Sequence, residues 1–557
     1  MKSHVRILIY NISIILLIGG CSSENDALDE ALQSITPQDL ASDTQILASD
    51  EFEGRGPATR GEEKTIQFLK EEFEKLGLQP GNGDSYFQEV PLIEITTDPE
   101  TRFAVRGKTG VKQFRYAEDF VALNKHMQES VQVQNSELVF VGYGIVAPEY
   151  GWNDYADIDV TGKTVVILVN DPGFATQDAS LFNGKAMTYY GRFAYKYEEA
   201  ARQGAIGAFV VHETDAAGYP WGVVRNSFTG PQFSLSDSSM TPVMVEGWMT
   251  VEMARAIFQH AGFAYDILKT SAADRGFKAK SLTLQASLNL ENAIRNSTSN
   301  NVIAILPGRE RSDEYLVYMA HWEHLGIDST LTDDSIYNGA LDNAIGTAAL
   351  LELAEAFSIL SKKPERSILF LAVTAHEIGL YGSAYYTQHP VYPLNQTVAA
   401  LIIGSVNTWG TMRDITIVGY GNSELDDYVV DVARSQGRTV RPDPESEKGY
   451  FYRNDHFNFA KQGVPVLYPN AGIDHREHGA EWGLKQIEDY ITNRYHKTSD
   501  EYDPNWDLSG MVEDLKLLFK VGYRLTNEST FPKWREGVEF KAKRDADMAR
   551  KTLNRPE

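Results

Sequence analysis

The sequence predicts an α/β fold, with a mostly parallel mixed sheet sandwiched by helices and a smaller inserted β/α domain. In the second half of the chain, short aliphatic runs alternate with longer amphipathic stretches. This alternation is typical of strands and helices that build a largely parallel sheet. Strands are expected at 302–306, 316–319, 368–373, 400–403, 415–418 and 464–467, and helices at 346–357, 423–436 and 508–525.

Length and composition limit the class of protein. The chain has 557 residues, of which 42% are hydrophobic, and a formal net charge of -25. This is the composition of a folded protein that is too long for one core. The acidic excess disfavours nucleic acid and anionic lipid surfaces as partners. The single cysteine excludes a disulfide framework and a cysteine-based zinc finger.

The first 20 residues have the pattern of a secretory signal peptide. Lys2 and Arg6 precede an apolar run over residues 7–18, and two glycines stand directly before Cys21. The apolar run is too short to span a bilayer, and a cysteine after small residues resembles the lipidation site of bacterial lipoproteins. We expect Cys21 to be lipidated and to anchor an exported lipoprotein of the cell envelope, periplasm-facing or at the outer membrane. An ordinary signal peptide with an incidental cysteine is the alternative.

The rest of the chain divides where its pattern changes. Residues 117–290 contain a strand, a helix near 193–203 and a further strand, separated by short glycine turns, which predicts a small β-α-β insert. We expect a signal peptide at 1–20, a polar lipid tether at 21–35, the first part of the main domain at 36–116, the insert at 117–290, the rest of the main domain at 291–535 and a solvated charged tail at 536–557.

Imidazole and carboxylate side chains follow several predicted strands of the main domain. Parallel sheets place ligands beyond the carboxyl ends of their strands, so such side chains meet at one edge. Taken singly, each has a structural explanation, such as a helix cap. Together, and without cysteine, they are the ligand types of a hydrolytic zinc centre. The candidates are His321, Glu323, Asp342, His376, Glu377 and His496.

Short motifs extend this pattern over nearly all of the chain after the signal peptide. They lie at 49–56 (SDEFEGRG), 142–145 (GYGI), 159–163 (DVTGK), 338–344 (NGALDNA) and 454–457 (NDHF). The set resembles the zinc exopeptidases of the aminopeptidase Y and glutamate carboxypeptidase type, with the second and third motifs similar to their inserted protease-associated domain. The resemblance implies a zinc-dependent exopeptidase that acts on peptides or peptide-like substrates, with aminopeptidase activity as the default.

The resemblance also implies roles for individual residues. The family uses two zinc ions, about 3.5–4 Å apart. By position, His321 matches a ligand of one ion, Asp342 the carboxylate that bridges both ions, and Glu377 and His496 ligands of the other ion. Glu323 matches the carboxylate that orients the zinc-binding His321.

Two positions depart from the family's pattern. His376 stands where a glutamate normally serves as general base, and Gly404 stands where an aspartate normally binds zinc. One ion keeps three ligands, whereas the other keeps only His321 and the shared Asp342, which is too few for a tight site. We therefore expect about one zinc ion per chain, with two possible if His475 or His478 replaces the lost ligand.

Three functions remain open at this point. The first is an exopeptidase with an altered site, in which His376 serves as base, because an unperturbed imidazole has a pKa near about 6.5. The second is a non-catalytic pseudopeptidase that binds peptides or a partner. The third is a single-zinc enzyme similar to the glutaminyl cyclases, which is disfavoured because those enzymes depend on an acidic residue at the position of His376.

Overall fold

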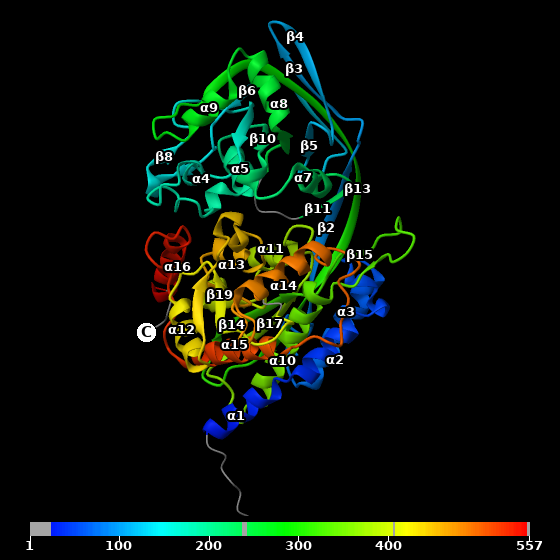
Figure 1. Ribbon diagram of the computed structural model, residues 1–557, viewed down its shortest axis with the longest axis vertical. Coiled ribbons are helices and arrows are strands. Elements are labelled where there is room, and N and C mark those ends of the chain that lie inside the picture. The colour runs from blue at the N-terminus through cyan, green and yellow to red at the C-terminus, as the bar shows by residue number, and fades with distance from the viewer. Residues whose placement is uncertain (1–23, 237–241, 405–406, 554–557) are drawn as a thin grey trace, which may run out of the picture.

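The computed structural model describes residues 24–236, 242–404 and 407–553. These residues form two lobes, a main lobe and a smaller insert lobe, which the 27-residue strand β13 (Lys280–Leu306) connects along one side of the molecule (Figure 1). Cys21 lies outside the described residues. In the described part of the chain, no helix has the length and apolar character that crossing a bilayer requires.

The main lobe is built on a mixed sheet with a parallel centre. Besides the end of β13, its strands are β1 (Gln79–Pro80), β2 (Phe87–Thr97), β11 (Pro231–Leu235), β14 (Arg311–His321), β17 (Arg366–Val373), β18 (Thr397–Ile402), β19 (Asp414–Val418), β20 (Thr439–Pro442) and β21 (Val466–Asn470). Pairing runs β11–β2–β13–β17–β14–β18–β21–β19–β20, and β17, β14, β18 and β21 are parallel to one another.

Helices cover both faces of this sheet. They are α1 (Glu24–Ser34), α2 (Pro37–Leu47), α3 (Arg60–Lys75), α10 (Ile345–Ser358), α11 (Tyr381–Gln388), α12 (Leu425–Ser435), α13 (His456–Lys461), α14 (Ala480–Asn493), α15 (Ser509–Asn527) and α16 (Lys541–Leu553). Along β14, Leu316 and Tyr318 pack with α3, α10 and α15, whereas Val317 and Met319 pack with α11 and α13. This period of two is that of a strand buried on both faces, and it confirms the predicted fold class.

The insert lobe has a sheet and a core of its own. Its strands are β3 (Arg102–Gly107), β4 (Gly110–Arg115), β5 (Phe120–Leu123), β6 (Ser130–Phe140), β9 (Thr164–Leu168), β10 (Gly207–His212) and β12 (Val245–Thr250), with helices α4 (Pro172–Thr176), α5 (Phe193–Arg202), α6 (Thr214–Ala217), α7 (Trp221–Phe228), α8 (Val251–His260) and α9 (Tyr265–Ala272). Pairing runs β4–β3–β13–β6–β9–β10–β12–β5, with β6, β9, β10 and β12 parallel.

The ends of the insert differ from the expected boundaries. The hairpin β3–β4 belongs to the sheet of the insert lobe although it precedes residue 117, and β13 passes residue 290 without a break. Conversely, β11 lies within residues 117–290 of the sequence but pairs with β2 in the sheet of the main lobe. The lobe therefore begins just after β2, and two long neighbouring strands, β2 and β13, carry it (Figure 1).

Two segments expected to be solvated are helices that pack on the main lobe. The expected tether at 21–35 contains α1, in which Ala27 and Ala31 are buried and face α10. Their spacing of four residues is about one helical turn, which is typical of a helix with one buried face. The many acidic residues around them made this pattern hard to recognise in the sequence. The expected tail contains α16, where the buried Arg544 donates hydrogen bonds to the carbonyls of Leu394 and Thr397. Both expectations of a solvated segment were wrong for these residues.

Candidate metal centre

Four predicted ligands converge at the carboxyl edge of the parallel strands. His321 ends β14, and Glu377 follows the neighbouring parallel strand β17, whose last residue pairs with His321. His321 Nε2 lies 3.3 Å from Asp342 Oδ1. One potential ligand atom each of His321, Asp342 and Glu377 lies within 4.8 Å of the others. His496, from the loop after α14, places Nε2 3.1 Å from Asp342 Oδ2 and 3.1 Å from Glu377 Oε2.

The geometry and charge of this cluster suit a divalent cation. His496 Nε2 is buried and faces two carboxylate oxygens, yet it makes a hydrogen bond to neither. Burial raises the pKa of Asp342, but the imidazoles of His321 and His496 outweigh it and hold that pKa well below its usual range. Two imidazoles and two ionised carboxylates without a thiolate form a donor set of the kind that holds zinc in hydrolytic sites.

A second layer of buried side chains holds the ligands in place. Asp500 accepts hydrogen bonds from the backbone nitrogens of Leu341 and Asp342 at 3.1 Å. Arg55 is fully buried and donates to four backbone carbonyls, those of Leu47, Trp322, Asn338 and Gly339. His324 Nδ1 lies 3.1 Å from Glu377 Oε1. Such outer contacts fix the orientation of metal ligands.

The carboxylate of Glu323 does not orient His321 as expected, but contacts the loop after β17. Its carboxylate lies 3.9 Å from His321 Nδ1, beyond a hydrogen bond, and His321 Nδ1 instead lies 3.1 Å from the backbone carbonyl of Glu323. The carboxylate accepts the backbone N–H groups of His376 and Glu377. Burial raises the pKa of Glu323 to about 7. Glu323 therefore positions the loop that carries Glu377, while its main chain orients His321.

His376 is held from two sides. Its Nδ1 lies 2.8 Å from Asp455 Oδ2, and its ring stacks on that of His321 with centroids 3.9 Å apart and planes 5° apart. Burial lowers the pKa of His376, but Asp455 and nearby carboxylates outweigh it and raise that pKa to about 10. A divalent cation at the cluster would oppose this effect. Sequence reasoning noted Asp455 only within a motif, because no spacing rule connects it to His376, 79 residues away.

Gly404 leaves no space for a side chain. A Cβ atom built there would lie 2.4 Å from Cε2 of Tyr468. The Tyr468 ring also packs against the buried His456, with centroids 4.9 Å apart. The position expected to have lost a zinc ligand is therefore covered by an aromatic ring, which the sequence did not reveal.

The proposed substitute ligands form a separate cluster. His475 stacks on His478 at 4.7 Å, and both rings pack against Trp482. His475 Nδ1 accepts the backbone N–H groups of Glu477 and His478. Within the described residues, none of these contacts reaches Asp342 or His321, so the structure does not bring His475 or His478 to the second ion.

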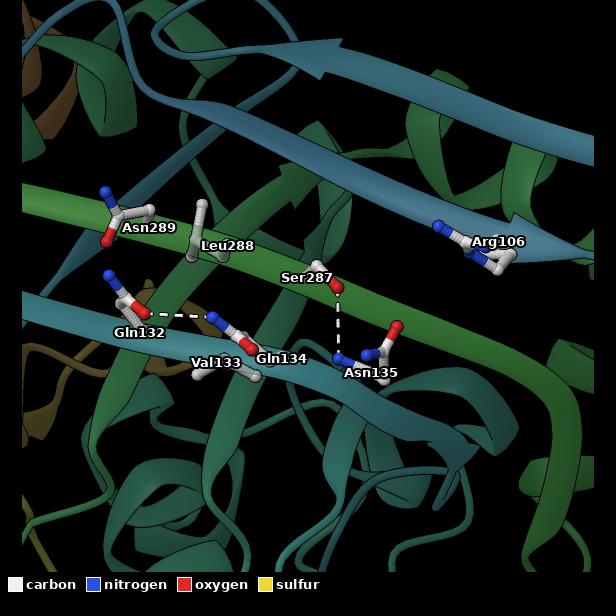
Figure 2. A pocket seen from close by; sticks show the side chains of 8 residues that line it. All are labelled: Arg106, Gln132, Val133, Gln134, Asn135, Ser287, Leu288 and Asn289. Atoms are coloured by element: carbon white, nitrogen blue, oxygen red, sulfur yellow. Dashed lines mark hydrogen bonds between the residues drawn. The ribbon is translucent and has the colours of Figure 1, made fainter.

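A surface groove of about 440 Å³ lies elsewhere, on the sheet of the insert lobe. Figure 2 shows its lining on β6 and β13, where Asn135 N donates to Ser287 Oγ at 3.0 Å and Gln134 donates to Gln132 at 2.9 Å. The lining is made of amides, a hydroxyl, two aliphatic side chains and one guanidinium. It offers no imidazole, thiol or carboxylate for hydrolytic chemistry, so the cluster on the main lobe is the better candidate site.

Comparison with known proteins agrees with this assignment. Residues 301–519, which contain the candidate cluster from His321 to His496, match the family described as Peptidase family M28. This segment is therefore similar to the peptidases of family M28. The matched segment includes the central parallel strands and α10, and it excludes the insert lobe.

Curated relatives match this chain over limited segments. Aminopeptidase NAALADL1 of Mus musculus is 33% identical over 122 residues, 21% of this chain and 15% of its own length. Aminopeptidase YwaD of Bacillus subtilis is 33% identical over 106 residues, 19% and 21% of the two chains. The probable glutamate carboxypeptidase AMP1 of Arabidopsis thaliana is 23% identical over 337 residues, 55% and 44%. The matches thus span less than half of each relative's length.

Among solved structures, the aminopeptidase from Aneurinibacillus sp. strain AM-1 aligns over 90% of this chain and 97% of its own, with 16% identity and a TM-score of 0.49. A zinc aminopeptidase from Bacillus subtilis aligns over 90% and 97%, with 16% identity and a TM-score of 0.42.

Proposed function

We propose that this protein is a zinc-dependent exopeptidase, by default an aminopeptidase, which works with about one zinc ion per chain and an altered base. The observation that carries the proposal is the convergence of Asp342, Glu377 and His496 on one point, with His321 beside them. Three ligands with an open position suffice for a hydrolytic zinc site. The match of the same segment to the model of Peptidase family M28 supports the assignment.

The chain's own residues would supply the remaining chemistry. A zinc ion held by this set would contribute Lewis-acid polarisation of the scissile carbonyl and activation of water. Asp455, when ionised, accepts from His376 Nδ1, so Nε2 is the ring nitrogen that can take a proton. Because an imidazole adds no negative charge beside the cation, and the second ion lacks a ligand at Gly404, we expect slow cleavage.

A second candidate function, a non-catalytic peptide-binding protein, is favoured by one observation. Tyr468 fills the space at Gly404, which supports the loss of the second ion's site to side-chain packing. Such a protein would keep the fold and the pocket and bind peptides without cleaving them.

One experiment separates the two. We would measure zinc per chain by mass spectrometry and the cleavage of alanine and leucine p-nitroanilides, before and after chelation, in the parent and in Glu377→Gln. About one zinc ion, with slow cleavage lost on chelation and in Glu377→Gln, supports the exopeptidase. Zinc without any chelator-sensitive cleavage of these substrates or of a peptide library supports the peptide-binding protein.

We also propose that the protein is exported and anchored by a lipid on Cys21. The apolar run over residues 7–18 and the glycines before Cys21 support this. Membrane fractions should contain the parent protein. The variant Cys21→Ala should either be released from the membrane or remain as an unprocessed precursor. Equal membrane partitioning of parent and Cys21→Ala would contradict the anchor.

A further inference from the structure

A pocket of about 400 Å³ opens at the carboxyl edge of the parallel strands in the insert lobe. His212 ends β10, Thr250 ends the neighbouring strand β12, and these two lining residues are paired in the parallel ladder. The other walls come from the starts of α6, α7 and α8 and from α9 (Figure 1). Parallel sheets bind ligands at this edge, and the volume is typical of small-ligand sites. All lining residues fall between 212 and 269, so the pocket is separate from the metal centre.

Two rings form one wall of this pocket. The ring centroids of His212 and Trp221 are 5.7 Å apart, and the ring planes are inclined by 64°. His212 is only 4% exposed, and its Nε2 lies 2.9 Å from the carbonyl oxygen of Tyr219. Burial lowers the pKa of His212, so at neutral pH the ring is uncharged, donates from Nε2 and keeps a lone pair on Nδ1. In the described part of the chain this Nδ1 has no hydrogen-bond partner, which leaves it as an acceptor for a ligand.

The cations that line the pocket are already paired, whereas one carboxylate is not. Lys269 forms an ion pair with Glu213. The guanidinium of Arg255, on α8, pairs with Asp266 at 3.0 Å. Glu252 lies in the first turn of the same helix and also lines the pocket. Among the residues that the structure describes, no cation forms an ion pair with Glu252. The pocket therefore holds one uncompensated negative charge.

We propose that this pocket binds a primary ammonium group, presented by a lysine side chain or by the N-terminus of a peptide or amino acid. The Glu252 carboxylate and the Nδ1 lone pair of His212 would accept its N–H groups, and such charge-assisted hydrogen bonds are stronger than neutral ones. The Trp221 ring adds a face for a cation–π contact. An anionic ligand would be repelled by Glu252, and an apolar ligand would leave both acceptors unpaired. The inference does not depend on the proposed function.

Binding of three small probes to the full chain tests the proposal. The probes are Nα-acetyl-lysine amide, with a side-chain ammonium, alanine amide, with an α-ammonium, and Nα-acetyl-norleucine amide, with neither. We would titrate them calorimetrically at about pH 7, where both amines are largely protonated, and in EDTA, so that no metal takes part. At least one ammonium probe should bind about 10-fold more tightly than the norleucine probe. Preference for the lysine or the alanine probe identifies the source of the ammonium group, and either supports the proposal.

Variants then assign the preference to this pocket. In Glu252→Gln, whose side chain is exposed and not needed for packing, the preference should fall to about 3-fold or less. Glu100→Gln is the matched control, because this exposed glutamate of the same lobe pairs with Arg102 at 3.0 Å and does not line the pocket. It should keep the full preference. Trp221→Leu should weaken the ammonium probes by about 3-fold or more and the norleucine probe by less, because leucine has no π face.

Equal binding of the three probes by the parent would overturn the site. A preference that persists unchanged in Glu252→Gln would do so as well, since the ammonium group would then bind elsewhere, for example at the metal-free carboxylates of Asp342 and Glu377. Equal losses in Glu252→Gln and Glu100→Gln would show a general effect of surface charge and would also contradict it. Because these titrations are made without metal, they stand or fall separately from zinc binding and cleavage.

Discussion

His376 and Asp455 form a buried pair, with Nδ1 of the imidazole 2.8 Å from Oδ2 of the carboxylate. The other carboxylate oxygen accepts a hydrogen bond from Ser383 Oγ at 2.5 Å. The chain Ser383–Asp455–His376 thus ends on a ring that stacks on the candidate ligand His321. The imidazole of His376 is therefore oriented by a buried carboxylate.

Replacement of Asp455 by Asn should slow catalysis without removing the metal. The amide group of Asn can donate to Nδ1 and so shift the proton of His376 to Nε2, where it blocks the base. We expect kcat to fall about 10–100-fold, the size of effect known for residues that orient catalytic or metal-binding groups, with KM and zinc content little changed. Steady-state kinetics and metal analysis check this.

Two controls accompany this prediction. Ser383→Ala removes only the outer hydrogen bond and should have a smaller effect, and the exposed Asp427→Asn should have none. A kcat of Asp455→Asn equal to that of the parent would show that the pair has no part in the reaction.

The ligand set can be tested by removing one imidazole. His496→Ala deprives both carboxylates of their neighbour at 3.1 Å. Zinc affinity should fall by more than the about 10–100-fold that loss of an outer contact costs. His475→Ala is the matched control, since this histidine lies in a separate stack with His478, and it should leave zinc affinity unchanged. A larger loss in His475→Ala would mean that the cluster has been assigned wrongly.

The sequence predicted the strands and the ligands better than their surroundings. Buried strands such as β14 and β17 have strong apolar runs that end at His321 and just before His376, so both their position and their chemistry are local in the sequence. The helices α1 and α16 were missed because their buried positions are few, and charged residues dominate their composition.

Contacts between segments far apart in the chain were not predictable in the same way. Asp455 reaches His376 only because α13 packs beside α11, and Tyr468 covers Gly404 only because β21 lies beside β18. The expected contact of the Glu323 carboxylate with His321 is absent for the same reason, because this side chain turns toward the loop after β17. Such relationships depend on the packing of neighbouring elements, for which no local pattern exists.

Stability should fall as the pH rises from about 5 to 8, in part because of Glu352. Burial, with the charges of Asp39, Glu355 and Asp43, raises the pKa of this carboxyl from 4.5 to about 8. The folded state therefore binds a proton that the unfolded state releases, so the free energy of unfolding decreases with pH in this window, by up to about 1.4 kcal/mol per unit. Urea unfolding at pH 5.5 and 8 measures it.

The isosteric variant Glu352→Gln isolates this contribution. It should flatten the pH dependence and be more stable than the parent at pH 8, because it carries no charge there. Glu355→Gln, on the same helix and less buried, should change the profile less. If parent and Glu352→Gln lose stability in parallel between the two pH values, Glu352 is not the titrating group.

The insert lobe should be removable without loss of the metal. Thr97 of β2 and Asn292 of β13 are paired across the base of the lobe, so deletion of residues 98–291 and closure by an Asn-Gly turn keeps this ladder. His321, Asp342, Glu377 and His496 all remain. We expect zinc content to be unchanged, as metal analysis of the folded variant would show. A folded deletion variant without zinc would mean that the lobe supplies a ligand.

Restoring a carboxylate at Gly404 should fail unless Tyr468 is also reduced. The Cβ atom of Gly404→Asp would lie 2.4 Å from the Tyr468 ring, and the packing of that ring against His456 limits its movement. Overpacking of this kind costs about 1–3 kcal/mol. Gly404→Asp alone should therefore be destabilised in urea unfolding and still hold about one zinc ion.

The double variant Gly404→Asp with Tyr468→Ala has space for the new carboxylate. It should bind a second zinc ion together with His321 and Asp342. Gly404→Ala with Tyr468→Ala opens the same space without a ligand, so it should remain at about one ion. Two zinc ions in Gly404→Asp alone, with parental stability, would show that Tyr468 moves freely and does not close the second site.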